Sequence, residues 1–383
     1  MQSRTQHFFG GLESLRGIAA LIVVLHHIGW SNPITHCNFV KNGYLMVDLF
    51  FVLSGFVMCY NYASKLGSAK EIAHFMLLRF GRLYPLHLFF LLVFLGIETV
   101  KMFAEMKFGL VPNHSRAFSV NNAPSFLAHL LLVQPFFHFA DRTYDAPSWS
   151  IGVEFYTYLF FALVILAFGK RRISLAAGLL VLLSILILST FSFTGLYVMN
   201  GLLGFLRCCF GFFTGVLAYQ VYNRYRFVIA QWSDKLGWGL LVILGVFLSR
   251  QTFGTKWDYL MPSLFGGMII ALAATSGGSL AKTFNVPPLR WLGKVSYSIY
   301  LCHEAIVIFM GQMLTQAQKI CSTHFSVQPN SGWVSALGFV FVCLTVMMAL
   351  IVSHFTYIWI ETAGQKWSRK MAKKWLDKKP VGA

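Results

Sequence analysis

An arginine and a histidine share one face of the first apolar segment. The segment from about residue 14 to 30 contains Arg16 and His27, eleven positions apart. Eleven helical steps of about 100° bring both side chains to one face, about 16 Å apart along the axis. Arginine can grip phosphate, and histidine can accept a proton near neutral pH. The pair could hold a nucleotide-bearing donor, although an interfacial anchor and a packed histidine would show the same spacing.

Two carboxylates fall at a depth similar to that of His27. Asp48 lies near the start of the apolar segment 44–63, and Glu154 near the start of 148–168. Ionisable residues inside apolar segments are costly and mark functional sites. A carboxylate next to a histidine fixes its tautomer and stabilises the imidazolium. Asp48 and Glu154 are therefore candidate catalytic residues that orient His27.

Other polar side chains have a structural and a functional interpretation. Arg207 lies at a similar depth and is expected to pair with Asp48 or Glu154, or else to line an acceptor path. We expect His303 to be a hydrogen-bonded buried histidine, although it could face the same cavity as His27.

A second arginine pair precedes the third apolar segment. Arg79 and Arg82 are three residues apart, so they lie on one side of a helical turn and could grip a diphosphate. Anchoring at the cytoplasmic surface is the alternative.

The elements that must position these residues are membrane-spanning helices. Hydrophobic residues make up 57% of the 383 positions and charged residues 11%, against about a quarter in soluble domains. We expect an all-α, polytopic membrane protein with ten transmembrane helices, near 14–30, 44–63, 84–104, 148–168, 173–190, 202–222, 236–250, 259–275, 293–314 and 333–360.

Charge distribution sets the expected topology. The apolar stretch 125–139 is short, and reading it as a non-crossing helix on the outer face leaves most lysines and arginines on the cytoplasmic side. Both termini are then cytoplasmic. The net charge of +18 reflects these loops, so no nucleic-acid partner is expected. Residues 1–365 form one domain and 366–383 a basic cytoplasmic tail.

The cysteines give little chemistry. Metal-ligand spacing of cysteine and histidine is absent from the sequence, so no metal is expected. Cys37 and Cys321 fall in predicted outer loops and could form a disulfide.

Taken in order, these segments resemble the acyltransferase 3 family of membrane O-acyltransferases. The resemblance rests on Leu15-Arg16-Gly17 through His27, on Val47-Asp48-Leu49-Phe50-Phe51, on Arg79 and Arg82, on Trp149-Ser150 with Glu154, on Ser296-Tyr297 through His303, and on Glu361. Met46 departs from the glycine that relatives often have there.

The resemblance implies an activity and its residues. It implies a multi-pass protein of the inner (plasma) membrane that takes an acyl group, usually acetyl, from cytoplasmic acyl-CoA. It also implies an acceptor outside, commonly a surface polysaccharide. His27 corresponds to the family's essential histidine, Arg16 to its arginine, and Arg79 and Arg82 to the acyl-CoA pair. Many relatives carry an additional soluble domain, so this chain resembles the stand-alone form.

Two mechanisms and one rival class stay open. His27 could act as general base or as a transient acyl carrier, with Asp48 or Glu154 orienting it. The rival is a proton-coupled transporter in which His27, Asp48, Glu154 and Arg207 form a relay. A non-catalytic scaffold would not need charges at matched depth.

Overall fold

The protein is an all-α membrane protein. The computed structural model describes residues 9–109, 115–137, 139, 143–199, 201–275, 277–325 and 332–377, and no strand occurs within these ranges. Seven of the described helical stretches are long and apolar enough to cross a membrane. The predicted fold class is thereby confirmed. Ten crossings and cytoplasmic termini stay predictions.

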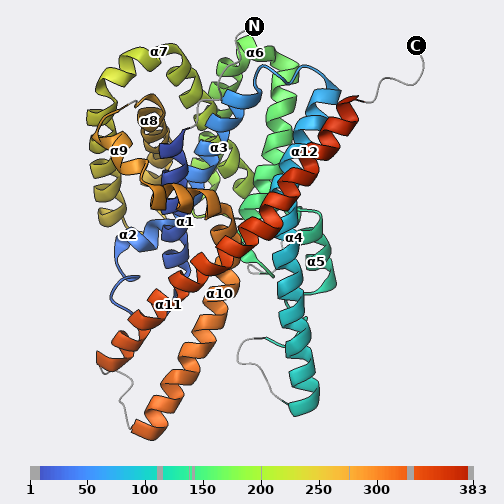
Figure 1. The fold of residues 1–383 in the computed structure, drawn as a ribbon, viewed down its shortest axis with the longest axis vertical. Coiled ribbons are helices and arrows are strands. Elements are labelled where there is room, and N and C mark those ends of the chain that lie inside the picture. The colour runs from blue at the N-terminus through green and yellow to red at the C-terminus, as the bar shows by residue number, and fades with distance from the viewer. Residues whose placement is uncertain are drawn as a thin grey trace, which may run out of the picture.

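The main helices follow the apolar segments. They are α1 (Gly10–His27), α3 (Met46–Tyr62), α4 (Ala69–Phe108), α6 (Trp149–Phe191), α7 (Gly201–Arg250), α8 (Met261–Ala274), α10 (Pro287–Phe325), α11 (Gly332–Thr356) and α12 (Thr362–Asp377). Shorter helices are α2 (Asn38–Lys41), α5 (Ala123–Leu130) and α9 (Ser279–Phe284). Figure 1 shows α10 and α11 side by side at the lower left and α12 lying along α4.

Small residues allow the helices that carry the candidate site to touch. A Cβ atom at Gly17 of α1 would lie 2.6 Å from the backbone nitrogen of Gly293 of α10. Such close approach is typical of helix pairs in membranes, where packing rather than the hydrophobic effect holds helices together. α1 and α10 therefore hold their polar side chains in a fixed relation.

Several predicted segments merge. Segments 148–168 and 173–190 both fall in α6, where Gly169 (φ 68°, ψ 166°) interrupts the helix. Segments 202–222 and 236–250 both fall in the continuous α7. Stretch 125–139 forms the eight-residue α5 and a 3-10 turn, Gln134–Phe136, and an eight-residue helix is too short to cross a bilayer, as predicted.

Two loop assignments differ from expectation. Cys321 lies on α10, which stays helical to Phe325, and both Cys37 and Cys321 are free thiols, so the suggested disulfide does not form. The predicted tail is helical through Asp377 as α12, while residues 378–383 lie outside the described part of the chain.

Candidate functional site

A cavity of about 600 Å³ lies where six helices meet. α1, α3, α4, α6, α10 and α12 all contribute to its wall. Four guanidinium groups line it, from Arg16, Arg79, Arg82 and Arg369. The cavity therefore contains all three arginines that the sequence analysis assigns to the donor, together with one that it did not single out.

Arg16 is held by α10. Its Nε donates to Ser296 Oγ at 2.8 Å, and one terminal nitrogen donates to the Gly293 carbonyl at 2.8 Å. The close contact of α1 and α10 at Gly17 and Gly293 makes this reach possible. Among the described residues the other three of its five N–H donors make no hydrogen bond, so they are available to a ligand.

The two arginines of α4, Arg79 and Arg82, differ in their contacts. Arg79 lies against the Tyr62 ring, 5.3 Å from its centroid, and donates to the Tyr62 hydroxyl at 3.2 Å. Its buried Nε has no partner among the described residues. Arg82 lines the same cavity and, within the described part of the chain, forms no hydrogen bond or ion pair. Glu361 is the carboxylate that attracts Arg82 most, and a partly buried guanidinium that lacks a hydrogen bond is suited to an anionic ligand.

Glu154 also lines the cavity, and its hydrogen bonds are to residues other than His27. Its Oε1 accepts hydrogen bonds from Ser54 and from the Tyr158 hydroxyl, the latter at 2.6 Å. Ser54 lies on α3 and Tyr158 on α6, so the carboxylate joins two helices on the cavity wall. These contacts do not support Glu154 as the residue that orients His27.

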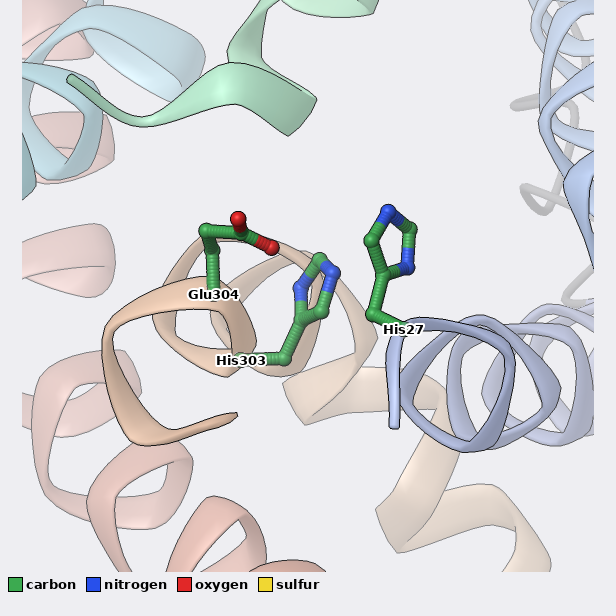
Figure 2. A group of neighbouring side chains, drawn as sticks. All are labelled: His27, His303 and Glu304. Carbon is green, nitrogen blue, oxygen red and sulfur yellow. The ribbon is translucent and has the colours of Figure 1, made fainter. Parts of the chain in front are cut away.

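His27 lies at the end of α1 beside His303 and Glu304 of α10. The two imidazole centroids are 4.7 Å apart with an interplanar angle of 67°. Figure 2 shows the His303 ring between Glu304 and His27. His303 is buried and hydrogen-bonded through Nδ1, as the sequence analysis expected, but its Nε2 has no hydrogen-bond partner among the described residues.

Backbone contacts fix the tautomers of both histidines. His27 Nδ1 lies 2.9 Å from the Val23 carbonyl, and His303 Nδ1 lies 2.6 Å from the Tyr300 carbonyl. A carbonyl only accepts, so each Nδ1 carries the proton and each Nε2 a lone pair. The cluster thus combines two basic nitrogens with a carboxylate, an arrangement that can receive a proton and stabilise the resulting imidazolium.

The same three residues have the types of a metal site. Each offers one ligand atom, and these atoms lie within 4.8 Å of one another. Histidine and carboxylate ligands, with the far ring nitrogen donating to a carbonyl, are common around zinc. The expectation that the protein uses no metal stays a prediction.

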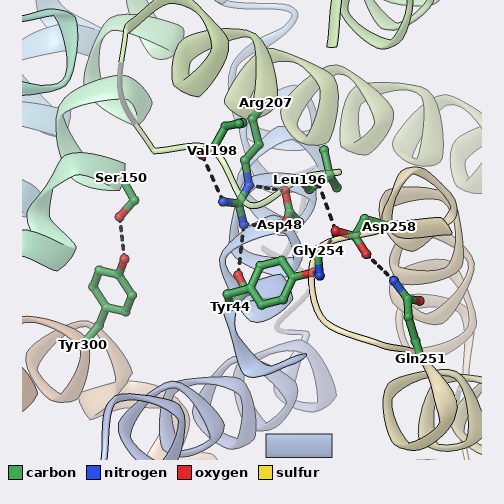
Figure 3. Close-up of polar contacts among 10 residues, drawn as sticks. All are labelled: Tyr44, Asp48, Ser150, Leu196, Val198, Arg207, Gln251, Gly254, Asp258 and Tyr300. Carbon is green, nitrogen blue, oxygen red and sulfur yellow. Dashed lines mark hydrogen bonds and ion pairs between the residues drawn. The ribbon is translucent and has the colours of Figure 1, made fainter. Parts of the chain in front are cut away.

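Asp48 has a structural partner. Arg207 Nε donates to Asp48 Oδ1 at 3.0 Å and a terminal nitrogen to Oδ2 at 2.7 Å, and both side chains are at most 1% exposed. Arg207 also donates to the Tyr44 and Val198 carbonyls (Figure 3). The expected pairing of Arg207 with Asp48 is confirmed, and both carboxylate oxygens of Asp48 accept hydrogen bonds from Arg207. A role for Asp48 in orienting His27 therefore has no support in these contacts.

The cavity does not reach His27 in this conformation. His27 is absent from its lining, which includes Phe50 and Tyr300. These two rings meet edge to face at 5.7 Å, and the His303 ring lies 5.7 Å beyond Tyr300. A second cavity of about 220 Å³ lies next to His26 and is lined also by His36, Lys41 and Phe253.

Sequence reasoning missed three polar side chains. Glu304 follows His303 directly and was not weighed as a partner of His27. Asp145 is 1% exposed with both carboxylate oxygens unpartnered among the described residues. Burial, and secondarily the Glu304 charge, raise the pKa of Asp145 well above its usual range. Arg369 was counted only among the basic residues of the tail.

Comparison with known proteins decides the family. The acyltransferase domain of the acyltransferase 3 family matches residues 9–352, nearly the whole chain. This chain belongs to the acyltransferase 3 family.

Similar proteins include two named O-acetyltransferases. The peptidoglycan O-acetyltransferase OatA of Listeria monocytogenes is 24% identical over 97% of this chain and 61% of its own length. The O-acetyltransferase OatA of Staphylococcus aureus is 24% identical over 81% of this chain and 52% of its own length. The chain thus spans less than two thirds of these relatives. No solved structure matches it.

Proposed function

We propose that the protein transfers an acetyl group from cytoplasmic acetyl-CoA to a hydroxyl of a cell-surface polysaccharide on the other side of the plasma membrane. Arg16, Arg79 and Arg82 bind the donor, and His27 acts on the acceptor hydroxyl. Peptidoglycan is the first acceptor to test, because one similar protein is named a peptidoglycan O-acetyltransferase.

One relationship carries this proposal. α1 contributes Arg16 to an arginine-lined cavity and ends at His27, in the cluster with His303 and Glu304. The helical rise separates Arg16 and His27 by about 16 Å. This is comparable to the pantetheine arm that separates the phosphates of CoA from its thioester. The donor can therefore be held by its phosphates at one end while its acyl group approaches His27.

The chemistry follows from the tautomer of His27. Its Nδ1 donates to the Val23 carbonyl, so Nε2 can take the proton of the acceptor hydroxyl. The acceptor oxygen then attacks the thioester carbonyl, the C–S bond breaks, and the proton passes to the departing thiolate. Glu304 stabilises the imidazolium while it exists. An acetyl-His27 intermediate would use the same atoms, and rapid quenching with mass analysis of the His27 peptide distinguishes the two routes.

A movement must accompany transfer. Phe50 and Tyr300 both line the cavity and contact each other, and the Tyr300 ring also contacts His303. We infer that these rings separate to let the pantetheine arm reach His27. When closed, the pair would keep water and acceptor away from the thioester, which limits wasteful hydrolysis.

The acceptor side has features of a carbohydrate site. The smaller cavity next to His26 combines the half-exposed ring of Phe253 with the polar groups of Thr35, His36 and Lys41. An aromatic ring can cover the apolar face of a sugar while the polar groups bond to its hydroxyls.

The contacts of Asp48 and Arg207 argue against the alternative of a proton-coupled transporter. A proton path through Asp48 and Arg207 would have to break a buried ion pair whose oxygens are both occupied. The observations therefore favour acyl transfer.

The surface polymer gives the test of this proposal. Cell-surface polysaccharides are isolated from cells that lack the gene and from the same cells carrying the wild-type or the His27→Ala form. Only the wild type is expected to add a mass of one acetyl group per modified sugar. Equal acetylation in all three strains would contradict the proposal. Loss of activity on chelation, restored by zinc, would reassign His27 to a metal.

A further inference from the structure

The C-terminal helix α12 is fixed against the arginine pair of α4. A Cβ atom at Gly81 would lie 2.1 Å from Ser368 Cβ, and one at Gly364 would lie 2.5 Å from Pro85 Cγ. The two helices therefore touch through glycines at two successive turns. Gly81 lies between Arg79 and Arg82 in the sequence, and Ser368 directly precedes Arg369. This packing places Arg369 next to the α4 arginines.

Arg369 is a wall residue of the large cavity. It lines the same 600 Å³ space as Arg16, Arg79 and Arg82. Unlike these three, which are partly buried, Arg369 is exposed, so it lies toward the opening. In the described ranges it forms no hydrogen bond or ion pair. Four arginines thus line the cavity with two carboxylates, Glu13 and Glu154, and Glu361, which does not line it, attracts Arg16 and Arg82. Arg369 has no such carboxylate among the described residues, and the net positive charge favours an anionic ligand.

The donor proposed above carries two separate phosphate groups. Its diphosphate is continuous with the pantetheine arm, whereas its 3′-phosphate is a monoester on the ribose. The monoester carries between one and two negative charges at neutral pH, and a planar guanidinium binds it through two parallel hydrogen bonds. Arginines gathered at one depth of the cavity could bind the diphosphate but could not reach the 3′-phosphate as well.

We propose that Arg369 binds the 3′-phosphate of the acyl-CoA donor, so that α12 sets the preference for CoA over its 3′-dephospho form. The inference rests on the proposed function. Arg79 and Arg82 then take the diphosphate deeper in the cavity, and Arg369 takes the monoester at the opening. α12 lies beyond residues 9–352, the part that matches the family. The residue is therefore a contribution of this chain outside the matched domain.

Lys370 provides a matched control. It is the next residue on α12, also exposed and basic, but it does not line the cavity. If α12 acts only by anchoring the chain to an anionic lipid surface, Arg369→Ala and Lys370→Ala have the same small effect. If Arg369 binds phosphate, only Arg369→Ala changes donor binding.

The test is calorimetric titration of the full chain in lipid nanodiscs with acetyl-CoA and with 3′-dephospho-acetyl-CoA. We expect the wild type and Lys370→Ala to bind acetyl-CoA at least tenfold more tightly than the dephospho form. Arg369→Ala should bind both with the weaker affinity. Equal discrimination by Arg369→Ala and the wild type would overturn this inference while leaving the donor intact. Absence of binding of either ligand to the wild type would overturn the proposed donor, and the inference with it.

Discussion

The imidazole rings of His27 and His303 lie 4.7 Å apart, and each donates its Nδ1 proton to a carbonyl of its own helix. His303 Nε2 is buried and, among the described residues, has no partner of its own. The lone pair on His303 lies beside His27, so the two rings can share a proton. The carboxylate of Glu304 stabilises the positive charge that this proton brings.

His303→Gln should slow transfer without weakening donor binding. The change removes the basic nitrogen next to His27, whereas His303 does not line the arginine cavity. We expect kcat to fall at least about tenfold, or about 1.4 kcal/mol of transition-state stabilisation, with the acetyl-CoA Kd unchanged. His74→Gln is the control, because His74 lies on α4 and lines neither cavity. Unchanged kcat for His303→Gln would exclude a catalytic contribution.

Arg82→Ala should weaken donor binding and leave the fold intact. Within the described ranges its guanidinium makes no hydrogen bond, and Glu361, the carboxylate that it attracts most, keeps its hydrogen bonds from Ser298 and Gln365. A hydrogen bond between charged groups contributes about 1.5–3 kcal/mol, which predicts a rise of at least about tenfold in the acetyl-CoA Kd. Arg82→Lys should keep part of the affinity. An unchanged Kd together with a lowered Tm would instead make Arg82 structural.

Asp48→Ala should destabilise the protein. The change leaves Arg207 buried and without its carboxylate, which costs about 3–5 kcal/mol. The double variant Asp48→Leu with Arg207→Met removes both charges and should recover most of the stability and the transfer activity. Thermal unfolding and transfer assays on the same samples measure both. A double variant that is stable but inactive would return Asp48 to the catalytic residues.

Acid should weaken the fold around α5. Burial, helped by His87, lowers the pKa of His129 to about 3, and its ring bonds to the Thr143 hydroxyl. An unfolded histidine titrates near 6.5, so between these values only the unfolded chain takes up the proton. The free energy of unfolding should fall by about 1.4 kcal/mol for each pH unit below 6.5 on account of His129 alone. His129→Gln should lose less stability than the wild type between pH 7 and pH 5, and an equal loss would contradict this origin.

The sequence predicted correctly that Arg16 and His27 share one helix, but it did not predict which side chains of other helices contact His27. Arg16 and His27 share a helix, so helical periodicity alone relates them, and the structure keeps both on α1, with His27 as its last residue and Arg16 six residues after its first. The partners of His27 come from other helices. Their choice depends on the rotation of each helix about its axis, which depth along the membrane does not determine. Asp48 lay at a suitable depth, yet it faces Arg207 of α7.

The role of Arg369 also could not be predicted, because it belongs to a run of basic residues near the C-terminus. The basic residues near the C-terminus fit cytoplasmic anchoring as a group, and nothing in their spacing distinguishes Arg369 from Lys370. Only the contact of Gly81 with Ser368 separates them, since it turns Arg369 toward the cavity. A backbone contact between helices more than 280 positions apart cannot be read from one sequence.

Transfer across a sealed membrane tests the central claim most directly. Purified protein is reconstituted into vesicles, the population with its cytoplasmic face outward is given radiolabelled acetyl-CoA outside, and a soluble peptidoglycan fragment is enclosed within. The account predicts that label accumulates on hydroxyls of the enclosed fragment with the wild type, and at background level with His27→Ala even though that variant still binds acetyl-CoA. Labelling by His27→Ala at the wild-type rate, or no labelling by a wild type that binds acetyl-CoA, would contradict it.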